Sequence, residues 1–295
     1  MYGMLRRYLI RPKNKRFSRG PCDLSRRGIC SSVKLRYISD LHLEYYHLQK
    51  LSLPQIEPEL PTDCLALCGD IGNPLFPNYK YFLEDMSSKF SKVFIISGNH
   101  EYYQPKENLI KQNIDQTDQL ISKLCQSFNN VYYLNNNSHE INNKVTIIGT
   151  TLWSNIFENH EIIQHSVNDY NYIYSGDSLF DINDSTRLNL INSKWIESEI
   201  SKASHLGKKL VVLTHHLPSY DLIIPKYKGH FASCCFANHS DYLIKDPVVA
   251  WLCGHSHCSI QTRINGVYCG INAVGYQKQQ TGFDYNQSVE IVFDE

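Results

Sequence analysis

Five short blocks of the sequence carry side chains that commonly bind metal ions. They read Asp40-x-His42, Gly69-Asp70, Gly98-Asn99-His100-Glu101, His215-His216 and Gly254-His255-x-His257. In a chain of this composition, Gly-Asn-His-Glu is expected by chance only about 0.002 times, whereas an Asp-x-His or a His-x-His pair is expected about 0.6–0.7 times. The four-residue block is therefore the strong signal, and the weaker blocks gain weight from the order in which they accompany it.

Asp, Asn and His side chains together supply mixed oxygen and nitrogen ligands for two cations. This mixture suits Mn²⁺, Fe²⁺/Fe³⁺, Zn²⁺ or Co²⁺, with manganese favoured, whereas Ca²⁺ prefers an all-oxygen site. Two such ions ~3.5–4 Å apart can bridge a hydroxide and clamp the oxygens of an in-line displacement at phosphorus. The ligand types therefore predict hydrolysis of a phosphoester.

Each block follows an apolar run of strand length. These five runs span residues 33–39, 64–68, 93–97, 210–214 and 248–253. Further strand-like runs lie at 131–134, 145–149, 267–271 and 288–293, and helix-like stretches lie at about 79–90, 105–128 and 186–206. Strands that alternate with helices predict an α/β fold with a largely parallel or mixed sheet covered on both faces. Ligand sites in such sheets form at the carboxyl ends of the strands.

Local backbone geometry adds three expectations about the blocks. On an extended backbone, side chains two residues apart point the same way, so Asp40 and His42 should face one site together. For the same reason only one of His215 and His216 should face the metals. The glycines at 69, 98 and 254 lack a Cβ beside a ligand, which allows the close backbone approach of a crowded site.

The five blocks, in this order, resemble the signature of the calcineurin-like metallophosphoesterase superfamily over residues 33–295. A closer resemblance is to a group of small phosphoesterases of bacteria and large DNA viruses. It rests on SDLHLE (39–44), LALCGDIGNP (65–74), SGNHEYY (97–103), VNDYNYI (167–173), THHLPS (214–219), CGHSH (253–257) and NAVGY (272–276). The resemblance implies a four-layer α/β/β/α sandwich of two mixed β-sheets.

The resemblance also implies a role for each ligand. Asp40, His42 and His257 would hold the first metal, Asp70 would bridge, and Asn99, His215 and His255 would hold the second. His100 would contact the phosphate and donate a proton to the leaving oxygen, a role that suits an imidazole near neutral pH. Asn99 would ligate through its carbonyl oxygen while its amide donates to a phosphate oxygen. Glu101 is expected to orient a neighbouring histidine or the backbone rather than bind metal.

The sequence departs from two branches of the superfamily. Protein serine/threonine phosphatases continue the second block with Asp-Arg-Gly and place Arg before Gly-Asn-His-Glu, whereas here Ile71 follows Asp70 and Ser97 precedes Gly98. A purple-phosphatase tyrosinate pattern is not evident either. These departures disfavour protein dephosphorylation and a charge-transfer Fe³⁺ site.

Residues that select the substrate lie outside the blocks, in the loops at about 73–77, 154–184 and 218–238. Weak candidates for substrate contact are Tyr102, His216, Tyr227 and His230. Tyr102, Tyr103, Tyr170, Tyr172 and Tyr174 could form a wall for a base or an aryl group, because aromatic faces stack on bases. Packing is the alternative for a chain with 20 Tyr.

Charge is unevenly distributed along this neutral, 295-residue chain. Residues 1–36 hold 11 Lys/Arg and one acidic residue, and the remainder holds 18 Lys/Arg and 28 acidic residues. We expect residues 1–32 to be a flexible basic extension and 33–295 to be the enzyme domain. A dispensable leader, an organelle transit signal or a nucleic-acid-binding arm would each fit this composition.

The remaining composition favours a cytoplasmic protein. No apolar run approaches the ~18 residues that a membrane span needs. The 10 Cys are scattered, several of them in strand-like runs, so we expect mostly buried free thiols rather than a disulfide framework. The Arg-rich N-terminus leaves organelle import as an alternative.

The sequence therefore favours a dinuclear-metal phosphoesterase that acts on a phosphodiester or a small phosphomonoester through a metal-bridging hydroxide. One alternative is a nuclease or nucleic-acid-processing enzyme that uses the basic arm, although the acidic body disfavours it because DNA binding rests on Lys/Arg contacts. Another alternative is a non-catalytic scaffold with the same fold, which would have no need of a complete ligand set.

Overall fold

The computed structural model describes residues 30–49, 52–104 and 111–294. The predicted basic extension lies outside the described residues except for positions 30–32, which form the start of strand β1 (Cys30–Ile38). The first strand thus begins three residues before the run that predicted it. Among the described helices, none is both long and apolar enough to cross a membrane.

One sheet contains five strands in the order β13-β1-β2-β3-β4. Strands β1, β2, β3 and β4 are parallel, and β13 pairs with β1 in the antiparallel sense. The bounds of the four further strands are Cys64–Cys68 (β2), Lys92–Ile96 (β3), Val131–Tyr133 (β4) and Ser288–Asp294 (β13). Three of the ligand blocks follow the carboxyl ends of β1, β2 and β3.

The second large sheet contains six strands in the order β11-β12-β10-β9-β6-β5. Its four central strands are parallel, and its two edge strands, β5 and β11, are antiparallel to their neighbours. The bounds are Asn137–Glu140 (β5), Val145–Thr150 (β6), Lys209–Thr214 (β9), Val248–Cys253 (β10), Ser259–Ile264 (β11) and Val267–Asn272 (β12). The other two ligand blocks follow the carboxyl ends of β9 and β10.

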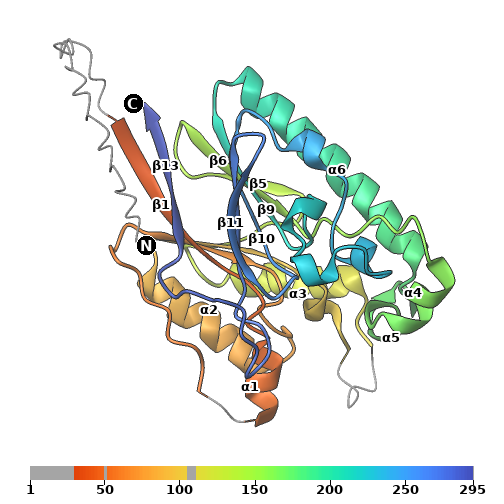
Figure 1. Cartoon of the computed structure of the whole chain (residues 1–295). Helices are drawn as coiled ribbons and strands as arrows, with labels where there is room; N and C mark the ends of the chain where they lie inside the picture. The colour runs from red at the N-terminus through yellow and green to blue at the C-terminus, as the bar shows by residue number, and fades with distance from the viewer. Residues whose placement is uncertain (1–29, 50–51, 105–110, 295) are drawn as a thin grey trace, which may run out of the picture.

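Side chains that alternate along the strands build a four-layer sandwich. In β2, Ala66 packs between the two sheets, while Leu65 packs against helices α2 (Pro77–Lys89) and α3 (Ile114–Cys125). In β9, Val211 faces the other sheet, and Val212 packs beneath the long helix α6 (Ile182–His205). Helices α2 and α6 therefore lie on opposite sides of the strands (Figure 1). The structure confirms the predicted α/β/β/α sandwich with two mixed sheets.

The segment between β6 and α6 forms a separate apolar cluster. It contains helices α4 (His160–Ser166) and α5 (Asp169–Tyr172) and a small hairpin of β7 (Tyr174–Ser175) and β8 (Ser178–Leu179). Trp153 packs here on Tyr102 and Phe180. This segment, predicted as a long loop or short-helix insertion, places α5 beside the third ligand block.

Short elements are the ones that differ from the sequence prediction. Helix α1 (Leu43–Gln49) and the edge strands β5 and β11 were not predicted, and the helix expected at 105–128 is described only from Ile114 to Cys125. Short 3₁₀ turns occupy His100–Tyr102, Tyr220–Leu222, Pro225–Tyr227, Ser233–Cys235 and Asp241–Leu243.

Candidate metal centre

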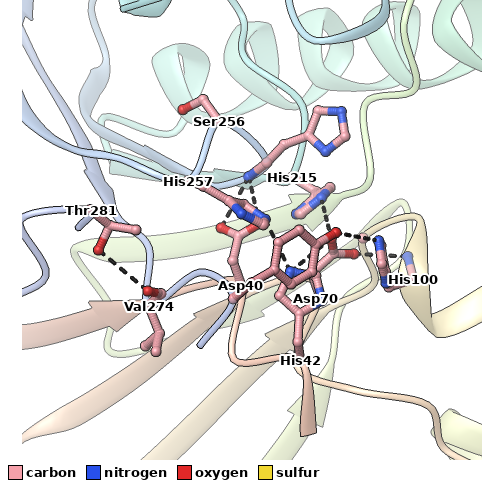
Figure 2. A network of polar contacts seen from close by, with 12 residues as sticks. Asp40, His42, Asp70, His100, His215, Ser256, His257, Val274 and Thr281 are labelled. Atoms are coloured by element: carbon pink, nitrogen blue, oxygen red, sulfur yellow. Dashed lines mark hydrogen bonds and ion pairs between the residues drawn. The ribbon is translucent and has the colours of Figure 1, made fainter. Parts of the chain in front are cut away.

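The predicted ligands converge where the carboxyl ends of the two sheets meet (Figure 2). Ligand atoms of Asp40, His42, Asp70 and His257 lie within 4.8 Å of one another, and so do those of Asp70, His215 and His255. Asp70 belongs to both groups. The carbonyl oxygen of Asn99 lies 3.1 Å from His215 Nε2, which adds it to the second group.

The backbone of the ligands is not extended as predicted. Strand β1 ends at Ile38, and the φ angles of Asp40 and His42 are 55° and 50°. Asp70, His255 and His257 have positive φ values as well. The left-handed conformation is unfavourable for residues with a Cβ, so it marks a turn that the surrounding structure enforces. Side-chain convergence therefore comes from tight left-handed turns after the strands.

Three of the ligating histidines present Nε2 to the site because an acceptor binds their Nδ1. His42 Nδ1 lies 3.1 Å from Glu44 Oε1, His215 Nδ1 lies 2.9 Å from the carbonyl oxygen of Cys68, and His257 Nδ1 lies 2.8 Å from Gln279 Oε1. Each acceptor places the proton on Nδ1 and leaves the lone pair on Nε2, as in metal-bound histidines. His255 is the reverse, since its Nε2 faces the carbonyl oxygen of Cys235 at 3.3 Å and leaves Nδ1 free.

These lone pairs point at other electron-rich atoms, and a cation bound between them would remove the resulting repulsion. His42 Nε2 and His257 Nε2 lie 3.0 Å apart. His215 Nε2 lies 3.1 Å from Asn99 Oδ1 and 3.4 Å from Asp70 Oδ2. Nitrogen lone pairs this close to other lone pairs repel unless a proton or a metal ion lies between them. The donor set, mixed in nitrogen and oxygen, therefore fits divalent metal ions of the Mn, Fe, Zn or Co type.

The charged groups of the site shift one another's pKa. Burial opposes ionisation of Asp70, but His215 and His100 hold the pKa of Asp70 well below its usual range. Burial likewise opposes charge on His215, yet Asp70 raises the pKa of His215 to about 10. His216 behaves differently, because burial and the neighbouring His215 lower the pKa of His216 to about 3. The residues around Asp70 thus stabilise its negative charge.

Glu101 ties two ligand loops together through the backbone, in agreement with the orienting role expected for it. Its Oε2 accepts hydrogen bonds from the backbone N–H of Asp70 at 3.0 Å and of Gly98 at 2.7 Å. Its Oε1 accepts from the N–H of Ile71 at 2.8 Å. All four residues are buried. The fourth residue of Gly-Asn-His-Glu therefore fixes the turn that carries Asp70 against the turn that carries Asn99.

His100 and His42 share one carboxylate. Glu44 Oε1 lies 3.0 Å from His100 Nδ1 and 3.1 Å from His42 Nδ1, so Glu44 accepts from both rings. The ring of His100 also stacks on Tyr103, and its Nε2 lies 3.3 Å from the Tyr276 hydroxyl. Burial lowers the pKa of His100, but Asp70 and Glu44 outweigh it and raise the pKa to about 9. Glu44 stands in the SDLHLE string, and its contact with His100 was not foreseen.

The amide of Asn99 is bound inside the protein, which corrects one expectation. Its Nδ2 donates to Asp169 Oδ1 at 2.8 Å and to the Tyr103 hydroxyl at 3.2 Å. Tyr103 in turn donates to Asp169 Oδ1 at 2.6 Å. Both amide hydrogens are thus engaged, so the amide is not available to a phosphate oxygen in this structure. Asp169 aims the carbonyl oxygen of Asn99 at the site, a role that the sequence did not indicate.

Three glycines make room for the ligands, as expected from their positions. A Cβ on Gly98 would collide with the carboxylate and the backbone nitrogen of Asp70. A Cβ on Gly69 would lie 2.5 Å from His215 Nδ1, and one on Gly254 would lie 2.9 Å from Asp40 Oδ2. Side chains larger than hydrogen at these positions would displace a ligand.

A cavity of about 470 Å³ opens beside the metal ligands. Tyr227 and His230, two of the weak candidates for substrate contact, line it. Tyr102 and His216 are not among the described residues that line it, because both are buried. The Tyr102 hydroxyl donates to Asp118, and the His216 ring packs against Trp153 and His255. Of the tyrosines expected to form an aryl wall, Tyr103 lines the cavity.

Eight cysteines whose side chains the structure describes are free thiols inside the protein. Cys64, Cys68, Cys125, Cys234, Cys235, Cys253, Cys258 and Cys269 are all free and buried. Cys22 lies outside the described residues. The expectation of buried free thiols is thus confirmed for these eight positions.

Comparison with known proteins agrees with this architecture. The family model of the calcineurin-like phosphoesterases matches residues 33–259. The uncharacterized protein L509 of Acanthamoeba polyphaga mimivirus is 35% identical over 283 residues, covering 87% of this chain and 96% of that protein. The phosphopantetheinyl hydrolase PptH of Mycobacterium tuberculosis shares the fold, with a TM-score of 0.63, 17% identity, and coverage of 88% of this chain and 96% of that one. The sequence blocks, the two-sheet sandwich and the family match together place this chain in the calcineurin-like phosphoesterase family.

Proposed function

We propose that this chain is a metal-dependent phosphoric ester hydrolase with two metal ions, acting on a phosphodiester or a small phosphomonoester. The observation that carries the proposal is the pair of ligand groups that share Asp70, with His100 beside them and a cavity open to both. Two divalent ions, with manganese favoured, would supply a Lewis acid and an activated water to the bound phosphoester.

The chain's own residues bind the two ions and orient the groups around them. We assign Asp40, His42 and His257 to one ion, Asn99, His215 and His255 to the other, and Asp70 to both. Glu44 and Asp169 hold the His100 ring and the Asn99 amide in place. Such hydrogen bonds to ligands and catalytic groups fix their orientation before the substrate arrives.

His100 is assigned the role of general acid. Its Nδ1 is bound by Glu44, so Nε2 is the nitrogen that faces the cavity side, near the Tyr276 hydroxyl. The hydrogen bond from Nδ1 to Glu44 favours the doubly protonated ring, which is the form that can give a proton from Nε2 to the leaving oxygen. The alcohol then leaves as a neutral molecule.

The proposal is tested by Mn²⁺-dependent hydrolysis of bis(4-nitrophenyl) phosphate beside 4-nitrophenyl phosphate, with bound manganese counted per chain. We expect turnover of one or both esters with two ions bound. Asp70→Asn should abolish turnover and lower the ion count, whereas Asp85→Asn on the surface of α2 should change neither. Full activity of Asp70→Asn would refute the assignment, and no turnover despite two bound ions would favour a binding role.

The nuclease alternative has less support. It relies on the basic residues before position 30, which lie outside the described residues. In addition, none of the described residues that line the cavity is Lys or Arg. Sequence-independent binding of nucleic acid depends on such contacts to phosphates.

A further inference from the structure

The cavity beside the metal ligands has two different halves. Its floor consists of the ligands and His100, which are polar. Its walls are formed by residues of the segment 223–236, which follows the His215 block, by Ser166, Val167 and Asn168 before α5, and by Tyr276 and Gln279. The apolar and aromatic members of these walls include Ile223, Ile224, Tyr227, Phe231, Ala232, Phe236 and Tyr276. A substrate with its phosphorus at the floor would therefore place its organic group against apolar side chains.

Four aromatic side chains of the walls are exposed. Tyr227, Phe231, Phe236 and Tyr276 have exposed fractions of 49%, 37%, 38% and 42%. Single exposed apolar residues are common on proteins, but a group of them around one cavity marks a binding surface. Phe236 also stacks on the ring of His255, with ring centres 4.5 Å apart. The aromatic wall thus begins in direct contact with the metal ligands.

Among the described residues of the cavity walls, His230 is the side chain that can carry a positive charge. Among the described lining residues, the acidic ones are Asp70 and Asp169, and none is Lys or Arg. Lys226 and Lys228 flank Tyr227 in the sequence, but both are exposed, and the ammonium group of Lys226 lies 4.6 Å from the centre of the Tyr227 ring, outside the lining. A second anionic group on the substrate would be desolvated without a Lys or Arg partner among the described lining residues, which is unfavourable.

We propose, building on the phosphoesterase function above, that the substrate carries a single phosphate group esterified to an uncharged, apolar or aromatic alcohol. Segment 223–236 and Tyr276 hold this alcohol portion. In the reaction, water loses one proton to the solvent and its oxygen bonds to phosphorus. The P–O bond to the alcohol breaks, and its electron pair stays on the alcohol oxygen. The alcohol departs with a proton from His100.

A matched pair of esters tests the charge preference. A 1-naphthyl phosphoester is compared with its 5-sulfonato analogue, and each rate is divided by that of the uncatalysed reaction so that leaving-group reactivity cancels. We expect kcat/KM to be at least about 10-fold higher for the uncharged naphthyl ester. Phe231→Arg should narrow this ratio by supplying a cation, and Lys226→Ala should leave it unchanged.

Binding of the alcohol portion is measured separately, on metal-free protein, by the fluorescence of 2-naphthol. We expect Phe231→Ala to raise the Kd for 2-naphthol at least about 5-fold, which corresponds to the loss of part of one aromatic contact. Tyr81→Ala is the matched control, because Tyr81 is a 59% exposed aromatic residue on helix α2, away from the cavity lining.

The outcomes separate the two proposals. Preference for the uncharged ester, together with weaker naphthol binding by Phe231→Ala, supports the inference. Equal or better turnover of the sulfonated ester, or loss of its turnover in Lys226→Ala, overturns the inference and leaves the phosphoesterase function standing. Absence of turnover for both esters in protein that holds two metal ions overturns the function and the inference together.

Discussion

Removing the carboxylate of Glu101 should destabilise the protein even without metal, because this side chain satisfies three buried backbone N–H groups. The donors belong to Asp70, Ile71 and Gly98, at 3.0, 2.8 and 2.7 Å. A hydrogen bond to a charged group contributes roughly 1.5–3 kcal/mol, and a buried donor left without a partner costs roughly 1–3 kcal/mol. For Glu101→Ala we expect a loss of about 3–6 kcal/mol, less than the simple sum because water can enter the space.

Glu101→Gln keeps the size of the side chain but replaces one of its two acceptor oxygens with a donor group. It therefore tests the hydrogen bonds separately from the packing of the side chain. Its one carbonyl oxygen can still accept from Asp70 and Gly98, but its amide group would face the N–H of Ile71 as a second donor. One hydrogen bond of the three is then lost, so we expect a decrease of about 1–3 kcal/mol in the free energy of unfolding.

Urea unfolding in the presence of EDTA measures both variants without a contribution from bound metal. Glu84→Ala, an exposed glutamate on α2, serves as the control and should remain within about 0.5 kcal/mol of the wild type. The reasoning is refuted if Glu101→Ala loses less than about 1 kcal/mol, or if Glu101→Gln is as unstable as Glu101→Ala.

Three further predictions concern residues that contact the candidate ligands or His100. Gly98→Ala should fold but lose metal, because its Cβ would collide with Asp70; metal analysis by mass spectrometry that finds two ions per chain would contradict the crowding seen here. Glu44→Ala should lower kcat roughly 10–100-fold. Partial recovery is expected in Glu44→Gln, since the glutamine oxygen can still accept from both histidines but carries no negative charge; unchanged steady-state kinetics would show that the ring of His100 needs no such support. Asp169→Ala should weaken Mn²⁺ binding roughly 10–100-fold by releasing the Asn99 amide, whereas equal Kd values by calorimetry would argue against this role.

The sequence was sufficient to bring the candidate ligands together because they follow strands that read as apolar runs and are largely buried. Parallel central strands read as continuous apolar runs, so β2 and β9 stand out, and the residue after such a run is placed at the sheet edge. The antiparallel edge strands β5 and β11 lack this signal. Strand β5 reads Asn-Ser-His-Glu, a polar sequence that indicates a turn as readily as a strand.

The contacts that orient the ligands could not be predicted in the same way. Glu44 meets His100 across 56 positions, and Asp169 meets Asn99 across 70 positions. No local pattern relates such pairs, because their contact depends on how α1 and α5 pack against the ligand turns. The left-handed backbone of Asp40 and His42 escaped prediction for a related reason: the turn is imposed by the backbone hydrogen bonds of His42 with Asp70 and of Asp40 with Gly69.

The pairing of β1 with β13 has a consequence for how the protein is made. Cys30 is the register partner of Asp294, so the first described strand lies beside the last one (Figure 1). During synthesis, β1 emerges from the ribosome long before β13 exists, and one of its edges stays unpaired in the meantime. Contacts this distant in sequence also slow folding, because a long loop must close first. Completion of the sheet that carries Asp40 therefore waits until β13 has been synthesised, and until then one edge of β1 lacks its strand partner.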